Sequence, residues 1–334
     1  MASGSPRAGQ GGAAPLMVEE FVGSVARLEW AKDNGCPWQP RTCAQAAKGG
    51  RLEVLQWARE HGCDWDEATC ARAAKCGHLE VLKWAREHGC PWEEVDEEGA
   101  EYLNNCCACA AEGGHLEVLK WLREQNCPWD AWTCAAGAGG GHLEVLKWAR
   151  QHGCPWVEVD EDDAEYTLNC CARAATGGHL KVLRWLREQD CPWDAGTCAF
   201  AARAGHLEVL KWAREHGCPW EEEGEDSGRD CCAHAAEAGH LEVLMWLREH
   251  GCPWDELTCE YAARCGHLEV LKWLRESHCP WDESTCAYAA DSGNLEILRW
   301  AREYHCPWDA RTRQLAEEGG HLELLQWAVE HGAP

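Results

Sequence analysis

The chain has 334 residues, a formal net charge of −26, 25 cysteines and 22 tryptophans, against only two phenylalanines. Such an acidic chain repels the phosphates of nucleic acids and anionic membrane surfaces, which disfavours both as partners. No apolar run approaches the roughly 20 residues that span a bilayer, and residues 1–20 lack the apolar core of a secretion signal. We therefore expect the cysteines to remain thiols in a reducing, cytoplasmic compartment.

The N-terminal segment, residues 1–15, is rich in Gly, Ala and Ser, and we expect it to be a disordered tail. Residues 16–334 repeat one unit that ends in Cys-Pro-Trp or, once, in Cys63-Asp64-Trp65. These endings recur every 27 residues, or every 34 or 37 where extra residues follow the tryptophan, and such a period is typical of a solenoid. The first copy, residues 16–38, keeps only its second half intact, and we expect it to be an N-terminal cap.

The unit at residues 66–92, DEATCARAAKCGHLEVLKWAREHGCPW, shows what one full copy contains. Asp66 is a favoured N-cap residue before a run of small residues, and Gly77 ends that run. The second half carries apolar residues at helical spacing. Gly89 suits the left-handed position after a helix, and Pro91 prevents the helix from continuing. Each unit is therefore predicted to be two short helices that must stack on their neighbours to bury an apolar face.

Three units carry extra acidic residues after the tryptophan, at 93–101, 157–165 and 221–226. These inserts hold 17 of the 57 acidic residues and no basic ones, and without them the acidic excess falls from 26 to 9. The concentrated charge predicts a basic protein partner; Ca²⁺ is the alternative ligand, although the spacing and glycine of an EF-hand are missing. The candidate partner-binding carboxylates are Glu94, Asp96, Glu97, Asp160, Glu161, Asp162, Asp163, Glu225 and Asp226.

The last copy, residues 309–334, differs from the others in its first half. Arg313, Gln314 and Glu317 replace small residues there. A terminal repeat needs such a polar outer side, so we expect a C-terminal cap with no further domain after it.

The segment 73–90 resembles the helical pair of the ankyrin repeat, Ala-Ala-x-x-Gly-His-x-x-Val-Val-x-x-Leu-Leu-x-x-Gly-Ala. Ala73-Ala74, Gly77-His78 and Gly89 match this pattern, and Cys90 stands where the family has Ala. The usual ankyrin period is 33 residues, and the residues missing here fall at the family's β-hairpin finger. Units of this short period are similar to the ankyrin arrays of algae, stramenopiles and large DNA viruses. The resemblance implies an all-α, helical-repeat solenoid of about eleven helix-turn-helix units, mostly without fingers.

The resemblance also implies a scaffold that binds a protein through the concave face of its first helices. No catalytic residue set or phosphate loop stands out in the sequence, so we expect a monomer without catalysis or a cofactor. The resemblance further implies that His78 and its equivalents bond the backbone across repeats. One first-helix position varies between units and contains an aromatic run, so we expect the partner to bind there; neutral drift is the alternative explanation. The residues concerned are Arg72, Arg173, Phe200, His234, Tyr261 and Tyr288.

The cysteines support a second hypothesis, a thiol-rich metal-binding or redox-buffering protein. Helices in contact are about 8–10 Å apart, so equivalent cysteines of adjacent units are too far apart for a disulfide or a shared zinc ion. We therefore favour a packing role, including for the Cys-x-x-Cys motif at 106–109. A third hypothesis, a ubiquitin-ligase substrate adaptor, is disfavoured because the chain shows no F-box-like segment.

The tryptophans fall into two sets. Those of the second helix, such as Trp84, lie on its apolar stripe, and we predict that they pack in the core. Those of the repeat endings, such as Trp92, are predicted to cover the end of the stack, and contact with a partner is the alternative.

Overall fold

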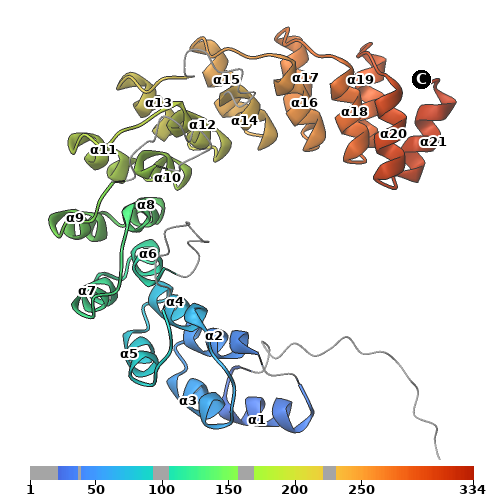
Figure 1. Ribbon diagram of the computed structural model, residues 1–334. Helices are drawn as coiled ribbons and strands as arrows, with labels where there is room; N and C mark the ends of the chain where they lie inside the picture. Colours follow the sequence, from blue (N-terminus) through green and yellow to red (C-terminus); the bar gives the residue numbers. More distant parts are fainter. Residues whose placement is uncertain (1–21, 37–38, 93–104, 157–168, 221–230) are drawn as a thin grey trace, which may run out of the picture. The chain divides into compact units, whose positions relative to one another are not determined.

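The computed structural model describes residues 22–36, 39–92, 105–156, 169–220 and 231–334 (Figure 1). Within these residues it contains 21 helices and no strand, which confirms the all-α prediction. The helices form two compact units, the first ending at Thr133 and the second beginning at Cys134. The acidic inserts and the N-terminal tail lie outside the described residues, so the expectations about them stay predictions.

In the first unit a single helix, α1 (Val25–Asp33), precedes three helix pairs. The pairs are α2 (Pro40–Lys48) with α3 (Leu52–Glu60), α4 (Glu67–Lys75) with α5 (Leu79–Glu87), and α6 (Cys106–Glu112) with α7 (Leu116–Glu124). The first helices of successive pairs, α2, α4 and α6, pack directly against one another. The boundary between the units falls within α8 (Ala131–Gly139).

In the second unit, α9 (Leu143–Gln151) is followed by six helix pairs. They are α10 (Cys170–Thr176) with α11 (Leu180–Glu188), α12 (Ala195–Arg203) with α13 (Leu207–Glu215), α14 (Cys231–Glu237) with α15 (Leu241–Glu249), α16 (Glu256–Arg264) with α17 (Leu268–Glu276), α18 (Glu283–Asp291) with α19 (Leu295–Glu303), and α20 (Ala310–Glu318) with α21 (Leu322–Glu330). In Figure 1 the even-numbered helices α10–α20 form one row, the first-helix row, and the odd-numbered helices α9–α21 form the second-helix row. No helix among the described residues is long and apolar enough to cross a membrane.

Most first helices begin at an Asp or Asn whose side chain caps the helix. The Oδ1 atom of Asn105 accepts a hydrogen bond from the Ala108 amide at 2.9 Å, and Asp309 accepts one from the Arg311 amide at 3.0 Å. Asp66 stands at the predicted N-cap position, but its side chain makes no capping hydrogen bond and one of its oxygens is buried without a partner. Such caps satisfy amides that a short helix leaves unpaired.

The unit at 66–92 has two turns with glycine, one between its helices and one after its second helix, and they depend on glycine for different reasons. Gly77 has φ +77°, and a Cβ atom at this position would lie 2.5 Å from Nδ1 of His115 in the next unit. Gly89, after the second helix, has φ +83° with open space around it, which confirms the predicted left-handed position. Asn126 and His278 occupy the same position with positive φ, so only the first of the two turns also excludes a side chain sterically.

The core lies between the two helices of each pair. On α12, Cys198, Ala201 and Ala202 are fully buried, and the small size of such residues lets successive first helices pack directly together. On α13, Val209 and Leu210 are buried, and burying one such side chain contributes about 1.5–3 kcal/mol. The positions that do not take part in this packing are therefore the ones that can vary without loss of the fold.

Candidate protein-binding surface

The variable first-helix position forms a line of half-buried side chains in the second unit. Arg173, Phe200, His234, Tyr261 and Tyr288 occupy the same place on α10, α12, α14, α16 and α18. Each of these helices packs against the next, so the residues follow one another along the first-helix row.

The sixth residue of this predicted set, Arg72, lies on α4 in the first unit and is half-buried. The nine predicted carboxylates all fall in the inserts, outside the described residues.

Charged side chains lie beside the aromatic residues of this line. The rings of Phe200 and His234 stack with centroids 6.3 Å apart. Glu237 lies 3.5 Å from Nδ1 of His234 and also pairs with Arg203 at 3.3 Å. Further along, the Arg264 guanidinium lies 5.5 Å from the ring centroid of Tyr288. The line therefore combines apolar rings with nearby groups of both charges, which is the chemistry of a protein contact surface.

Two residues of this surface were missed by sequence reasoning. Leu315 is half-buried at the equivalent place on α20, six residues after Asp309, just as Tyr288 follows Asp282. Counting from the capping aspartate would have found it. Glu260, next to Tyr261, stands where α12, α14 and α18 have alanine.

The carboxyl group of Glu260 is half-buried, and this burial raises its pKa. The negative charge of Asp282 raises it further, while Arg264 and Arg311 lower it. The ionised carboxylate is thus held on the first-helix row with incomplete compensation by nearby cations.

The histidines after the turn glycines link successive units. Nε2 of His267 lies 3.0 Å from the carbonyl oxygen of Glu237, which ends α14, the first helix of the preceding unit. His321 makes the same contact with the Asp291 carbonyl at 2.9 Å. This confirms the backbone role that the resemblance implied.

A family model described as "Ankyrin repeats (many copies)" matches residues 70–123 and 232–275. The first match extends over α4 to α7, and the second over α14 to α17. These two segments are ankyrin repeats. Ankyrin repeats generally mediate protein–protein interaction and are typically non-enzymatic binding scaffolds.

Among solved structures, the chain is similar to the human ASB11 ankyrin repeat domain, with 18% sequence identity and a TM-score of 0.45. This match covers 60% of the present chain and 98% of the other. No curated protein matches the sequence.

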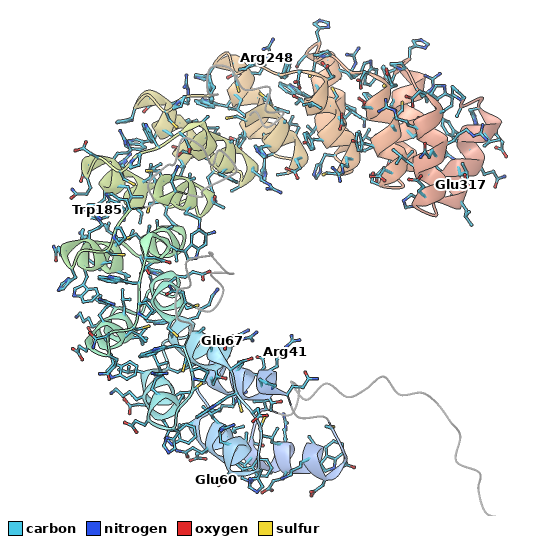
Figure 2. All side chains as sticks on the ribbon, in the orientation of Figure 1. Arg41, Glu60, Glu67, Trp185, Arg248 and Glu317 are labelled. Atoms are coloured by element: carbon cyan, nitrogen blue, oxygen red, sulfur yellow. The ribbon has the colours of Figure 1, made fainter. Side chains whose placement is uncertain are left out.

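Aromatic stacks join successive units along the second-helix row. The prediction that the tryptophans of the second helices pack in the core is wrong. Every described tryptophan is half-buried or, in Trp30, exposed. Trp212 on α13 contacts Trp193, which ends the preceding unit, edge to face at 6.1 Å, and His216 stacks on it at 4.2 Å. Smaller valine and leucine residues fill the core, so the indole rings lie between adjacent second helices. Figure 2 labels one of them, Trp185 on α11.

The cysteines of one unit meet each other, which sequence reasoning had not considered. The Cys107 thiol lies 3.9 Å from the carbonyl oxygen of Cys127, and Cys171 and Cys191 are arranged in the same way. A hydrogen bond with Cys154 and burial both raise the pKa of Cys134. None of the 25 cysteines forms a disulfide, and most are buried. Within the described residues, no three His, Cys, Asp or Glu side chains are arranged to hold a metal ion.

Proposed function

We propose that this protein is a scaffold that binds a partner protein through the aromatic row, defined as Phe200, His234, Tyr261, Tyr288 and Leu315. The observation that carries this proposal is where the repeat varies. Alanine and cysteine recur on the buried faces of the first helices, while the changing residues stand half-exposed on helices that pack side by side. Aromatic side chains supply a large contact area at low entropic cost, and such rings often dominate binding energy.

The partner segment that fits this surface is basic. Glu260 lies beside Tyr261, and burial and Asp282 both raise the pKa of its carboxyl group. A lysine or arginine placed next to this carboxylate supplies the compensating charge. The carboxylates of the three inserts, Glu94 to Asp226, remain candidates for the same partner. Their role would be to speed the encounter, since exposed charges mainly affect association rates.

Arg173 lies at the other end of the line from Tyr288, on α10, and Arg72 lies in the first unit. Both carry positive charge, so we assign them to acidic residues at the edge of the partner rather than to its basic segment. The chain is further proposed to act as a monomer without catalysis in a reducing cytoplasm, where its thiols persist.

Selection of peptides from a displayed random library tests the proposal even though the partner is unidentified. We expect the selected peptides to carry a net positive charge and to bind the wild-type protein. The double variant Y261A/Y288A should weaken binding at least tenfold in fluorescence anisotropy, because each ring contributes about 1 kcal/mol or more.

The matched control is Tyr304→Ala, because Tyr304 is exposed at the end of α19 in the second-helix row. This variant should bind like wild type. Neutralising the insert carboxylates to Asn and Gln should slow association by a smaller factor. Selected peptides without net positive charge, or equal binding by Y261A/Y288A, would contradict the proposal.

A further inference from the structure

A second surface lies in the second-helix row, away from the aromatic row. A cavity of about 470 Å³ lies between α11 and α13, and we call it the α11–α13 groove. It is lined by Arg184, Arg187, Glu188, Trp212 and His216.

A similar cavity of about 440 Å³ lies between α9 and α11, the α9–α11 groove. Its lining residues are Lys147, Arg150, Gln151, Trp185 and Gln189. The two grooves have the same architecture, so a difference in their charge can be traced to individual substitutions.

Both grooves are lined by two cations, and the α11–α13 groove also has the carboxylate of Glu188. They differ in whether the first cation is paired, and this difference comes from the start of one helix. Nine of the ten second helices from α3 to α21 begin with Leu-Glu, whereas α11 begins with Leu180-Lys181. In α9, Glu144 pairs with Lys147 at 3.0 Å and neutralises it. In α11 the residue three positions before Arg184 is Lys181, so this pairing is replaced by two like charges, and both side chains are exposed.

The sister repeat shows how local this change is. Residues 90–153 and 154–217 are near-copies, and α7 is the counterpart of α11. There Glu117 and Lys120 form the usual ion pair at 2.7 Å. The change from Glu117 to Lys181 therefore turns a neutral pair into two adjacent cations, and the change from Lys120 to Arg184 keeps the positive charge.

Arg187 and His216, which also line the α11–α13 groove, are each fixed by an aromatic ring and a backbone carbonyl. Arg187 stacks on Trp193, with its guanidinium carbon 4.3 Å from the ring centroid, and donates a hydrogen bond to the Cys191 carbonyl. His216 stacks on Trp212 and contacts the Trp212 carbonyl oxygen at 2.8 Å.

Arg184 is less constrained, at 5.8 Å from the Trp212 ring centroid. Glu188 contributes one negative charge to the lining, against the positive charges of Arg184 and Arg187. The groove therefore places the exposed guanidinium group of Arg184 beside the indole ring of Trp212.

We propose that the α11–α13 groove binds an acidic segment of a partner protein, with a carboxylate at Arg184 and the segment lying against Trp212. Charge complementarity supports this occupant, because arginine pairs with carboxylate through two parallel hydrogen bonds. The chain as a whole repels acidic ligands, but at physiological salt charges beyond about 8 Å are largely screened. This site therefore acts locally and is independent of the basic segment assigned to the aromatic row.

A dye-labelled hexaglutamate peptide, with hexaglutamine as its uncharged control, tests the site by fluorescence anisotropy in about 0.15 M salt. Wild-type protein is expected to bind hexaglutamate and not hexaglutamine. The variant K181E/R184K gives α11 the sequence of α7, so the fold is expected to be retained and the affinity to fall at least tenfold. The reciprocal variant E144K/K147R gives α9 the start of α11, and it should add a second site in the α9–α11 groove.

Equal binding of hexaglutamate by wild type and K181E/R184K would overturn the proposal, as would no binding by wild type. Tighter binding of single-stranded oligothymidine, lost in K181E/R184K, would instead assign the groove to nucleic acid. Self-association that disappears in K181E/R184K, without peptide binding, would assign it to a second copy of the chain. Each of these outcomes rejects an acidic partner segment as the occupant.

Discussion

The two helix rows of the second unit are built from different side chains and offer different surfaces. Successive first helices touch through small residues such as Cys198 and Ala201, so variation is confined to side chains that point away from these contacts. Successive second helices are bridged by tryptophan stacks such as Trp193 with Trp212, which leave grooves between them. The stacked repeats therefore provide a continuous line of side chains along the first-helix row and separate grooves along the second-helix row.

One pair of positions shows how the spacing differs. Ala213 on α13 corresponds to Leu186 on α11 and Leu247 on α15, and all three are buried. The second-helix row thus accepts either residue at this position. Ala235 lies on α14, and the equivalent position of every other first helix from α10 to α20 is also alanine. The first-helix row has no room for a larger side chain there.

Substitution of leucine at these two positions should separate the rows most clearly. Ala235→Leu is expected to lower the free energy of unfolding by about 2–3 kcal/mol, because overpacking displaces tightly packed helices. Ala213→Leu should cost less than about 1 kcal/mol, because neighbouring repeats already carry leucine there. Urea denaturation followed by circular dichroism measures both values. Equal destabilisation by the two variants would show that the rows are equally tightly packed.

The histidine bridge connects the two rows and should have an intermediate effect. His267, at the start of α17, contacts the carbonyl oxygen of Glu237 at the end of α14. His267→Ala removes this hydrogen bond and is expected to lower the free energy of unfolding by about 1 kcal/mol. His267→Asn should cost less, because Asn294 occupies the same place on α19 and its amide points to the Ala263 carbonyl at 3.5 Å. An unchanged stability in His267→Ala would exclude the bridge as a stabilising contact.

What could be predicted from the sequence was what recurs at the same place in every unit. The helix pair, the left-handed Gly89 and the bridging role of His78 all follow from residues at fixed spacing or from the resemblance that this spacing carries. The His78 contact is present, at 3.0 Å from the Lys48 carbonyl. Repetition made these features visible because the same residue types recur at the same positions in successive units.

What could not be predicted depends on contacts between non-equivalent positions. The reasoning about cysteine compared equivalent residues of adjacent units and so missed that Cys107 meets Cys127 within one unit. The indole of Trp212 lies on an apolar stripe, but its place beside Trp193 depends on the spacing of second helices. The α11–α13 groove likewise requires knowing which helices face each other, although Lys181 was visible in the sequence as a departure from the repeat.

The smallest expected effect concerns the charge on the first-helix row. Burial raises the pKa of Glu260, so the folded chain favours its protonated form. The stability contributed by this group is present below the unfolded-state pKa and is lost as the pH rises through the folded-state pKa. At pH 7 the carboxylate is therefore destabilising, and Glu260→Gln is expected to raise the melting temperature by about 1–2 °C. At pH 4 the wild type and Glu260→Gln should have the same melting temperature.

The control is Glu242→Gln, which removes an exposed carboxylate from α15 in the second-helix row. An equal gain from Glu242→Gln would attribute the effect to the overall negative charge rather than to the burial of Glu260. In the complex with a basic segment, the ionised Glu260 carboxylate should be stabilising rather than destabilising, because a neighbouring cation favours its charge. Glu260→Gln should then stabilise the protein alone and weaken its complex, a combination that a purely structural carboxylate would not produce.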